Sequence, residues 1–305
     1  MEVQKIYRDA SNGEGKLMTR VWKPDGNVRA LVQIAHGMGE HCGRYSEFAA
    51  ALTEQGYAVY ANDHAGHGES TLGHPGTFSL KEGGFEYVIR DMYTLTQRMR
   101  EEYPERKLML FGHSMGSLLS ALYATRFGES IDALALCGMP AYNPMTGFGI
   151  KYSRLVMKLF GRKKTSRLLA AANRSAFNKG IENRQSDHDW LTHDVNKLME
   201  AAHDPYLKIN FSASAYNEML SALVELNSDE WAKKVPLFPM LIVAGKQDPC
   251  GDFGKAPEIY RERLEKTGHS VGFRLFENDR HEILNELDRA QVMDYIIGWM
   301  NGQAG

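Results

Sequence analysis

A serine between two glycines, in the run G-H-S-M-G at residues 112–116, is the feature of this chain that points most directly to chemistry. Residues 107–111 have the composition of a buried strand, and residues 117–124 have that of a helix. A sharp strand-to-helix turn leaves no room for side chains beside it, and it places a serine hydroxyl at the helix N-terminus, where free N–H groups favour negative charge. The pattern predicts a nucleophile at Ser114, although an ordinary glycine turn after a strand has a similar local sequence.

A nucleophilic serine needs a base that removes its proton and an acid that orients the base. On a strand-helix scaffold of this kind the acid and then the histidine follow the serine along the chain. The strand expected at residues 239–244 runs into a loop that contains Asp248, which is our candidate for the acid. Asp252 is a weaker candidate because it lies further along the same loop.

Two histidines, His269 and His281, follow Asp248 and could act as the base. His269 precedes the strand expected at residues 271–276, which puts it at the opposite edge of the sheet from the serine. His281 follows that strand and therefore reaches the same edge as Ser114 and Asp248. We predict a Ser114, Asp248 and His281 triad.

The charge that develops on a substrate carbonyl oxygen requires two N–H donors, an oxyanion hole. One expected donor is the backbone N–H of Met115, directly after the serine. The second should come from the loop H-G-M-G-E-H at residues 36–41, where two glycines let a backbone amide approach the site. Within that loop we choose the N–H of Met38.

Composition excludes several classes of function. The chain has 305 residues, 43% hydrophobic, and a formal net charge of −2, so it offers no overall basic field for nucleic acid and favours a small-molecule substrate. Three cysteines without C-x-x-C spacing argue against a disulfide framework or a structural zinc site. The N-terminus lacks an apolar stretch typical of a signal peptide, which predicts a cytoplasmic protein.

Histidine and aspartate also cluster in D-H-A-G-H-G-E-S at residues 63–70, which raises the question of a metal site. The spacings typical of zinc ligands are missing, and the two glycines fit a tight loop packed beside the serine. The chain also has no G-x-G-x-x-G motif and no P-loop. We therefore expect neither a metal nor a cofactor.

The order of predicted elements indicates an α/β fold. After a hairpin at residues 3–8 and 16–22, expected strands alternate with expected helices, which predicts a mostly parallel sheet with helices on both faces. The strands are expected at 31–35, 57–61, 107–111, 131–137, 239–244 and 271–276, and the helices at 45–55, 85–103, 117–124, 256–266 and 290–300.

Residues 141–235 break this alternation and have apolar residues at helical spacing. We therefore predict a core of residues 1–140 and 236–305, with residues 141–235 inserted as a helical cap. An insertion at the carboxyl ends of parallel strands lies above the crevice where such folds bind ligands. Packing of the helices on the core is the alternative explanation for their apolar faces.

Taken together, the motifs resemble those of the monoacylglycerol lipase and lysophospholipase-like α/β-hydrolases. The resemblance rests on residues 36–45, 63–70 and 112–116 and on the loops of Asp248 and His281, and segment 189–194, D-W-L-T-H-D, resembles one typical of bacterial members. It implies an α/β-hydrolase fold and the same five site residues: Ser114, Asp248, His281, Met38 and Met115. Ser117 departs from the family, where many relatives have glycine; we expect it to alter packing of the elbow helix more than the chemistry.

The resemblance also implies a lid that accepts an acyl chain. We further expect transient contact of the cap with a membrane surface. Cys250 resembles a cysteine near the site of some relatives, so we hypothesise a partly accessible thiol whose modification blocks the pocket. The candidate wall residues, for each of which core packing is an equally good explanation, are Met145, Phe148, Leu155, Leu159, Phe177 and Met219.

We accordingly expect a serine hydrolase without a cofactor that cleaves monoacylglycerol-like or other medium- to long-chain acyl esters. The first alternative is an aminopeptidase or amidase on the same fold, for which Glu182, Asp187 or Asp189 could bind a substrate amine. The second is a ligand-binding protein that kept the scaffold without the activity. Acyl length, alcohol and oligomeric state do not follow from the sequence.

Overall fold

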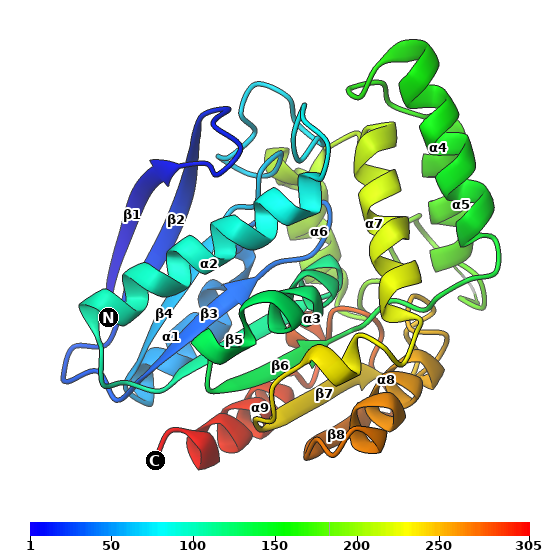
Figure 1. Ribbon diagram of the computed structural model, residues 1–305. Helices are drawn as coiled ribbons and strands as arrows, with labels where there is room; N and C mark the ends of the chain where they lie inside the picture. The colour runs from blue at the N-terminus through cyan, green and yellow to red at the C-terminus, as the bar shows by residue number, and fades with distance from the viewer. Residues whose placement is uncertain (183) are drawn as a thin grey trace.

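The computed structural model describes residues 1–182 and 184–305. Eight strands form one sheet in the order β1-β2-β4-β3-β5-β6-β7-β8, with helices packed on it (Figure 1). The strands β1 (Glu2–Asp9) and β2 (Lys16–Lys23) form the predicted antiparallel hairpin at one edge. The α/β-hydrolase fold expected from the sequence is confirmed.

Parallel pairing joins β3 through β8, as the strand-helix alternation predicted. Every residue of β3 through β7 is buried, because helices cover both faces of this part of the sheet, whereas the edge strand β8 is partly exposed. The bounds are β3 Ala30–Ala35, β4 Tyr57–Asn62, β5 Leu108–His113, β6 Ala133–Cys137, β7 Met240–Gly245 and β8 Val271–Phe276.

Two hydrophobic clusters lie on opposite faces of the sheet. Helices α1 (Ser46–Glu54) and α9 (Arg289–Gln303) supply buried side chains to one cluster. Helices α2 (Gly84–Glu102), α3 (Met115–Phe127) and α8 (Lys255–Lys266) supply the other. Because β3 through β8 run parallel, their carboxyl ends meet at a common edge, where ligands bind in open α/β sheets.

Between β6 and β7 the chain leaves the sheet for residues 141–235, which we call the insertion. Its described residues form helices and no strand beyond an isolated bridge between Thr165 and Ser212. Helix α7 packs on α3, and α4 packs on α7, so α4 and α5 lie farthest from the sheet (Figure 1). The bounds are α4 Thr146–Phe160, α5 Arg167–Phe177, α6 Val195–His203 and α7 Ala213–Leu226.

None of the helices in the described part of the chain is long and apolar enough to cross a membrane.

Candidate active site

Ser114 stands at the sharp turn between the end of β5 and the start of α3. Its backbone has φ 54° and ψ −118°, a strained conformation for a residue with a side chain. A Cβ on Gly116 would lie 2.0 Å from the carbonyl oxygen of Ala35, so glycine is required for α3 to pack this closely against β3. The serine is half-buried, which leaves its hydroxyl accessible at the edge of the sheet.

The first turn of α3 lies directly beneath the serine. The Ser117 hydroxyl donates a hydrogen bond to the carbonyl oxygen of Ser114 at 2.5 Å, and the Ser117 N–H donates to the same oxygen at 2.9 Å. Ser117, which departs from the family pattern, is thus a fully buried part of the elbow. The N–H groups at the start of a helix have no acceptor within it, so that of Met115 is free to bind an anion.

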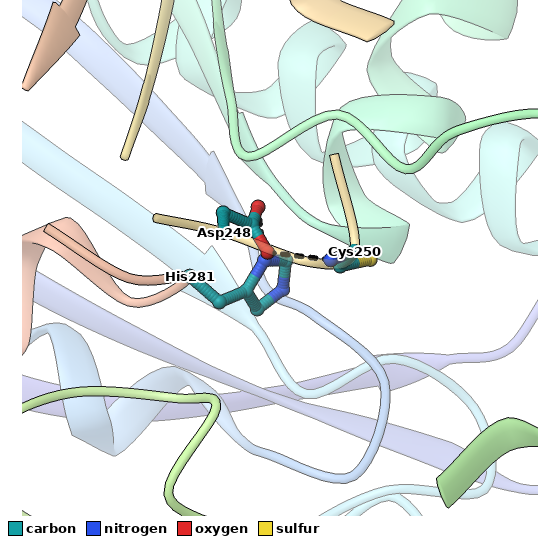
Figure 2. Close-up of side chains that lie close together, drawn as sticks. All are labelled: Asp248, Cys250 and His281. Carbon is teal, nitrogen blue, oxygen red and sulfur yellow. Dashed lines mark hydrogen bonds and ion pairs between the residues drawn. The ribbon is translucent and has the colours of Figure 1, made fainter. Parts of the chain in front are cut away.

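His281 and Asp248 come together from the loops after β8 and β7. The Nδ1 atom of His281 lies 2.8 Å from Oδ2 of Asp248, and both side chains are buried (Figure 2). The other oxygen of Asp248, Oδ1, accepts the N–H of Cys250 at 2.8 Å. Because Asp248 engages Nδ1, the Nε2 atom of His281 is available for proton transfer.

The two competing candidates lie elsewhere. Asp252 is exposed and pairs with Lys255 at 3.3 Å. His269 precedes β8, at the far edge of the sheet, and its Nε2 atom lies 3.2 Å from the carbonyl oxygen of Val235. Geometry therefore favours Asp248 and His281 over Asp252 and His269.

The electrostatic surroundings of His281 favour its protonated form. Burial, the largest single influence, lowers the pKa of the imidazole, but the charge of Asp248 and its hydrogen bond outweigh burial, so the pKa lies above its usual 6.5. Neighbouring His113 behaves oppositely: burial lowers its pKa to about 4, so it is neutral near pH 7. The two ring centroids are 4.8 Å apart, and within the described residues the ring of His281, unlike that of His113, is hydrogen-bonded to a carboxylate.

The loop at residues 36–41 packs directly against the serine. A Cβ on Gly37 would lie 3.1 Å from the Cβ of Ser114. Within the described chain, the Met38 N–H makes no hydrogen bond. This loop therefore brings an unpaired amide to the neighbourhood of the serine, as an oxyanion hole requires.

A buried ion-pair network, which the sequence analysis missed, connects this loop with the His281 loop. Arg44 donates from Nη1 and Nη2 to the two carboxylate oxygens of Glu282 at 2.6 and 2.7 Å, and from Nη1 to Glu40 at 3.1 Å. Glu40 also accepts the N–H of Gly37 at 2.5 Å. The i, i+4 spacing of Glu40 and Arg44 is visible in the sequence, but their contact with Glu282, 238 residues beyond Arg44, arises only on folding.

The insertion contacts His281 through Trp190, another residue to which the sequence analysis gave no role. The indole and imidazole centroids are 4.8 Å apart, and the centroid of the Phe177 ring lies 4.5 Å from that of the Trp190 ring. The Glu282 N–H donates to the carbonyl oxygen of Leu191 at 2.7 Å. Aromatic side chains of the insertion therefore cover the histidine.

The six candidate wall residues fall into two groups. The ring of Phe177 lies against that of Trp190 at a tilt of 32°, and Met219 is half-buried against the core, so both lie on the inner side of the insertion. The other four, all at or within α4, are more than half exposed: Met145, Phe148, Leu155 and Leu159.

Cys250 differs from the hypothesis of a partly accessible thiol. It is only 4% exposed, and burial raises the pKa of its thiol well above 9. Its Sγ lies within 4.8 Å of the Asp248 and His281 donor atoms, the one group among the described residues with the composition of a metal site. The protonated thiol and the hydrogen bonds of Asp248 fit an acid-base pair better than a set of metal ligands.

Of the three acids considered for amine binding, one is engaged by its own loop and two are exposed. Asp189 accepts the N–H groups of Gln185 and Ser186 at 2.7 and 3.1 Å, within its own loop. Asp187 is exposed and lies 3.6 Å from Arg184. Glu182 is also exposed.

Comparison with protein-family models matches residues 26–288 to the family described as serine aminopeptidase, S33. The chain is 41% identical over 114 residues to the monoglyceride lipase of Rattus norvegicus, an alignment that covers 37% of this chain and only 36% of that protein. It is 39% identical over 291 residues, 92% of each chain, to a monoglyceride lipase homolog of Monkeypox virus. A thermostable carboxyl esterase from Bacillus coagulans, solved with glycerol, superposes with a TM-score of 0.93 at 28% identity over 100% of both chains.

Proposed function

Because the chain belongs to the serine aminopeptidase, S33 family, we propose that it is a serine ester hydrolase acting on monoacylglycerol-like or other medium- to long-chain acyl esters. The observation that carries the proposal is the buried His281–Asp248 pair, which lies at the same sheet edge as a serine on a strained elbow. A serine held in this conformation exposes its hydroxyl to a substrate, and a buried imidazole–carboxylate pair is the base that such a hydroxyl needs.

In the proposed reaction, His281 Nε2 takes the hydroxyl proton as Ser114 Oγ attacks the ester carbonyl. The N–H groups of Met38 and Met115 bind the oxyanion of the tetrahedral intermediate, and Asp248 holds the imidazole tautomer. The alcohol leaves with the proton from His281. Water then attacks the acyl-enzyme by the same sequence and releases the fatty acid.

Ester cleavage is favoured over amide cleavage by two observations, although the family description names an aminopeptidase. Relatives that match this chain include monoglyceride lipases and a carboxyl esterase. Asp189, the buried candidate for an amine-binding acid, is occupied by its own loop. Glycerol in the esterase structure from Bacillus coagulans supports a polyol leaving group.

The test is replacement of Ser114 and of its neighbour Ser117. We expect Ser114→Ala to lower kcat for a monoacylglycerol on the order of a million-fold and to abolish labelling by a fluorophosphonate. Ser117→Ala is the matched control and should still be labelled. Retained hydrolysis in Ser114→Ala, or labelling of another residue, would contradict the proposal, and faster cleavage of aminoacyl anilides than of nitrophenyl esters would favour the peptidase.

We also propose that the insertion rests on an anionic lipid surface while substrate enters. Residues 133–181 contain nine Lys and Arg and no Asp or Glu, a local excess hidden by the net charge of −2. The same stretch carries the exposed apolar side chains of α4. Apolar side chains that enter the headgroup region, flanked by basic ones, bind anionic bilayers.

Vesicle sedimentation tests this contact. Vesicles with phosphatidylglycerol should retain the protein at low salt, and pure phosphatidylcholine vesicles should retain less of it. Replacing Lys151, Arg154 and Lys158 with Gln should weaken retention, whereas the same change at three basic residues of the core, Lys107, Lys246 and Lys266, should not. Equal binding to both kinds of vesicle would contradict an electrostatic contact.

A further inference from the structure

Segment 189–194 of the insertion is hydrogen-bonded to the loop that carries His281. Successive residues of the segment bond to the loop, so this part of the insertion and the His281 loop form one packed unit. The bonds run from Arg280 Nη1 to Asp189 O (2.6 Å), His281 N to Trp190 O (3.4 Å), Glu282 N to Leu191 O (2.7 Å), Thr192 Oγ1 to Asn285 O (2.9 Å) and His193 N to Glu286 Oε2 (3.0 Å).

Trp190 is the member of this segment that reaches the imidazole. Its ring centroid lies 4.8 Å from that of His281 with an interplanar angle of 37°, and Phe177 supports the indole from α5. The imidazole is 2% exposed, so its surroundings are almost entirely protein. A cation within about 6 Å of an indole centroid is attracted by the electron-rich ring, most strongly where water is excluded.

We propose that Trp190 is a positioning residue for His281. Its indole keeps the imidazole in place for the hydrogen bond with Asp248, and it stabilises the imidazolium that forms when His281 takes the serine proton. The inference rests on the proposed role of His281 as the base. It assigns to the insertion a part in the chemical step, in addition to binding the acyl chain.

Other groups face His281, and the contribution of Trp190 adds to theirs. Asp248 and the more distant Glu282 and Glu40 favour the charged imidazole, whereas burial opposes it; neighbouring His113, with a pKa of about 4, is neutral near pH 7. Arg44 neutralises part of the charge of the two glutamates. The thiol of Cys250 is protonated and contributes no charge.

Trp190→Leu is the decisive variant, because it keeps an apolar side chain and removes the aromatic ring. We expect kcat to fall about 10-fold with little change in KM, and the acid limb of kcat/KM to move down by up to about one pH unit. Trp190→Phe keeps a ring and should recover most of this loss. Trp299→Leu, at the other half-buried tryptophan of the second half of the chain, is the matched control. It should leave kcat and the acid limb of kcat/KM unchanged.

A second measurement needs no turnover. Since a nearby imidazolium quenches indole emission, the fluorescence difference between the wild type and Trp190→Phe should titrate with the midpoint of the acid limb. This pH-dependent fluorescence transition should persist in the Ser114→Ala background, which separates this inference from the proposed function. It should disappear in the His281→Ala background.

Three results would overturn the inference. One is a Trp190→Leu variant with unchanged kcat and an unchanged acid limb. Another is a rise in KM alone, which would assign Trp190 to the substrate wall. The third is the absence of a His281-dependent fluorescence transition in the folded protein.

Discussion

The sheet side of the site and the insertion above it are built differently. On the sheet side, strands β3 through β7 are buried at every position, and the elbow packs so closely on β3 that glycine is required at residue 116. In the insertion, α5 buries only Leu169 and α6 buries no residue, while large apolar side chains on α4 are exposed. Helix α7 and segment 189–194 are exceptions: α7 packs on α3, and the segment is bonded to the His281 loop.

This difference separates the demands of chemistry from those of substrate binding. Proton transfer and oxyanion binding require groups held to within a fraction of an ångström, which close packing provides. An acyl chain requires apolar surface that can open and close, and helices with few buried contacts move most readily. The predictions below test this contrast.

The largest of these effects is expected at Asp248, the acid that orients the base. Asp248→Asn should lower kcat about 10⁴-fold, because an amide can leave the imidazole in the wrong tautomer while preserving the packing. Steady-state kinetics on a short nitrophenyl ester measures the loss. Asp252→Asn, four residues away on the same loop, is the control; an equal loss in that variant would show that the loop and not the carboxylate matters.

The next largest effect concerns the ion pairs that join the loops of the site. Arg44→Met should lower the free energy of unfolding by about 3–5 kcal/mol, because it leaves Glu282 and Glu40 buried without their cationic partner. Arg126→Met removes a partly exposed pair with Glu86 and should cost less than about 1 kcal/mol. Urea denaturation measures both free energies of unfolding. Similar losses in Arg44→Met and Arg126→Met would mean that the buried ion pairs stabilise the fold no more than the partly exposed one.

A pair of leucines tests the contrast in packing itself. Leu136→Ala, in the buried strand β6, should cost about 2–5 kcal/mol, whereas Leu159→Ala, on the outer surface of α4, should change stability by less than about 0.5 kcal/mol. Leu159→Ala should instead reduce retention on phosphatidylglycerol vesicles. A large stability loss at Leu159 would mean that α4 is packed as firmly as the core.

A pH dependence of stability is expected from the His281 loop. Burial, together with Asp288 and Glu286, raises the pKa of Asp279 from 3.8 to about 8. The folded protein therefore keeps a proton that the unfolded chain loses above about pH 4, so this carboxyl makes folding less favourable as pH rises from 4 to 8.

Asp279→Asn removes that titration. Its melting temperature relative to the wild type should rise between pH 4 and 8 and level off above. The exposed Asp294→Asn should show no such trend. A constant difference at every pH would mean that Asp279 does not titrate in this range.

Much of this protein could be predicted from local patterns. The alternation of short apolar runs with amphipathic stretches predicted the strands and the core helices, because buried parallel strands and half-buried helices differ in period and length. Glycine spacing identified the elbow, since its backbone needs a close approach that side chains prevent. Chain order and sheet polarity selected Asp248 and His281, and the fold brings these two side chains together.

Contacts between distant segments could not be predicted in this way. Glu282 meets Arg44 across 238 residues, and Trp190 reaches His281 from the insertion, neither of which leaves a periodic signal in the sequence. Exposure of α4 was equally hidden, because an apolar helical face has the same pattern whether it packs on a core or remains open.

The residue types and their order along the chain thus determined the fold class and the candidates for the chemistry, because backbone geometry and strand direction act locally. Folding decided which groups surround His281, how much of the insertion is buried, and that Cys250 is enclosed. Burial and electrostatic surroundings depend on neighbours in space, and these neighbours come from segments far apart in the chain.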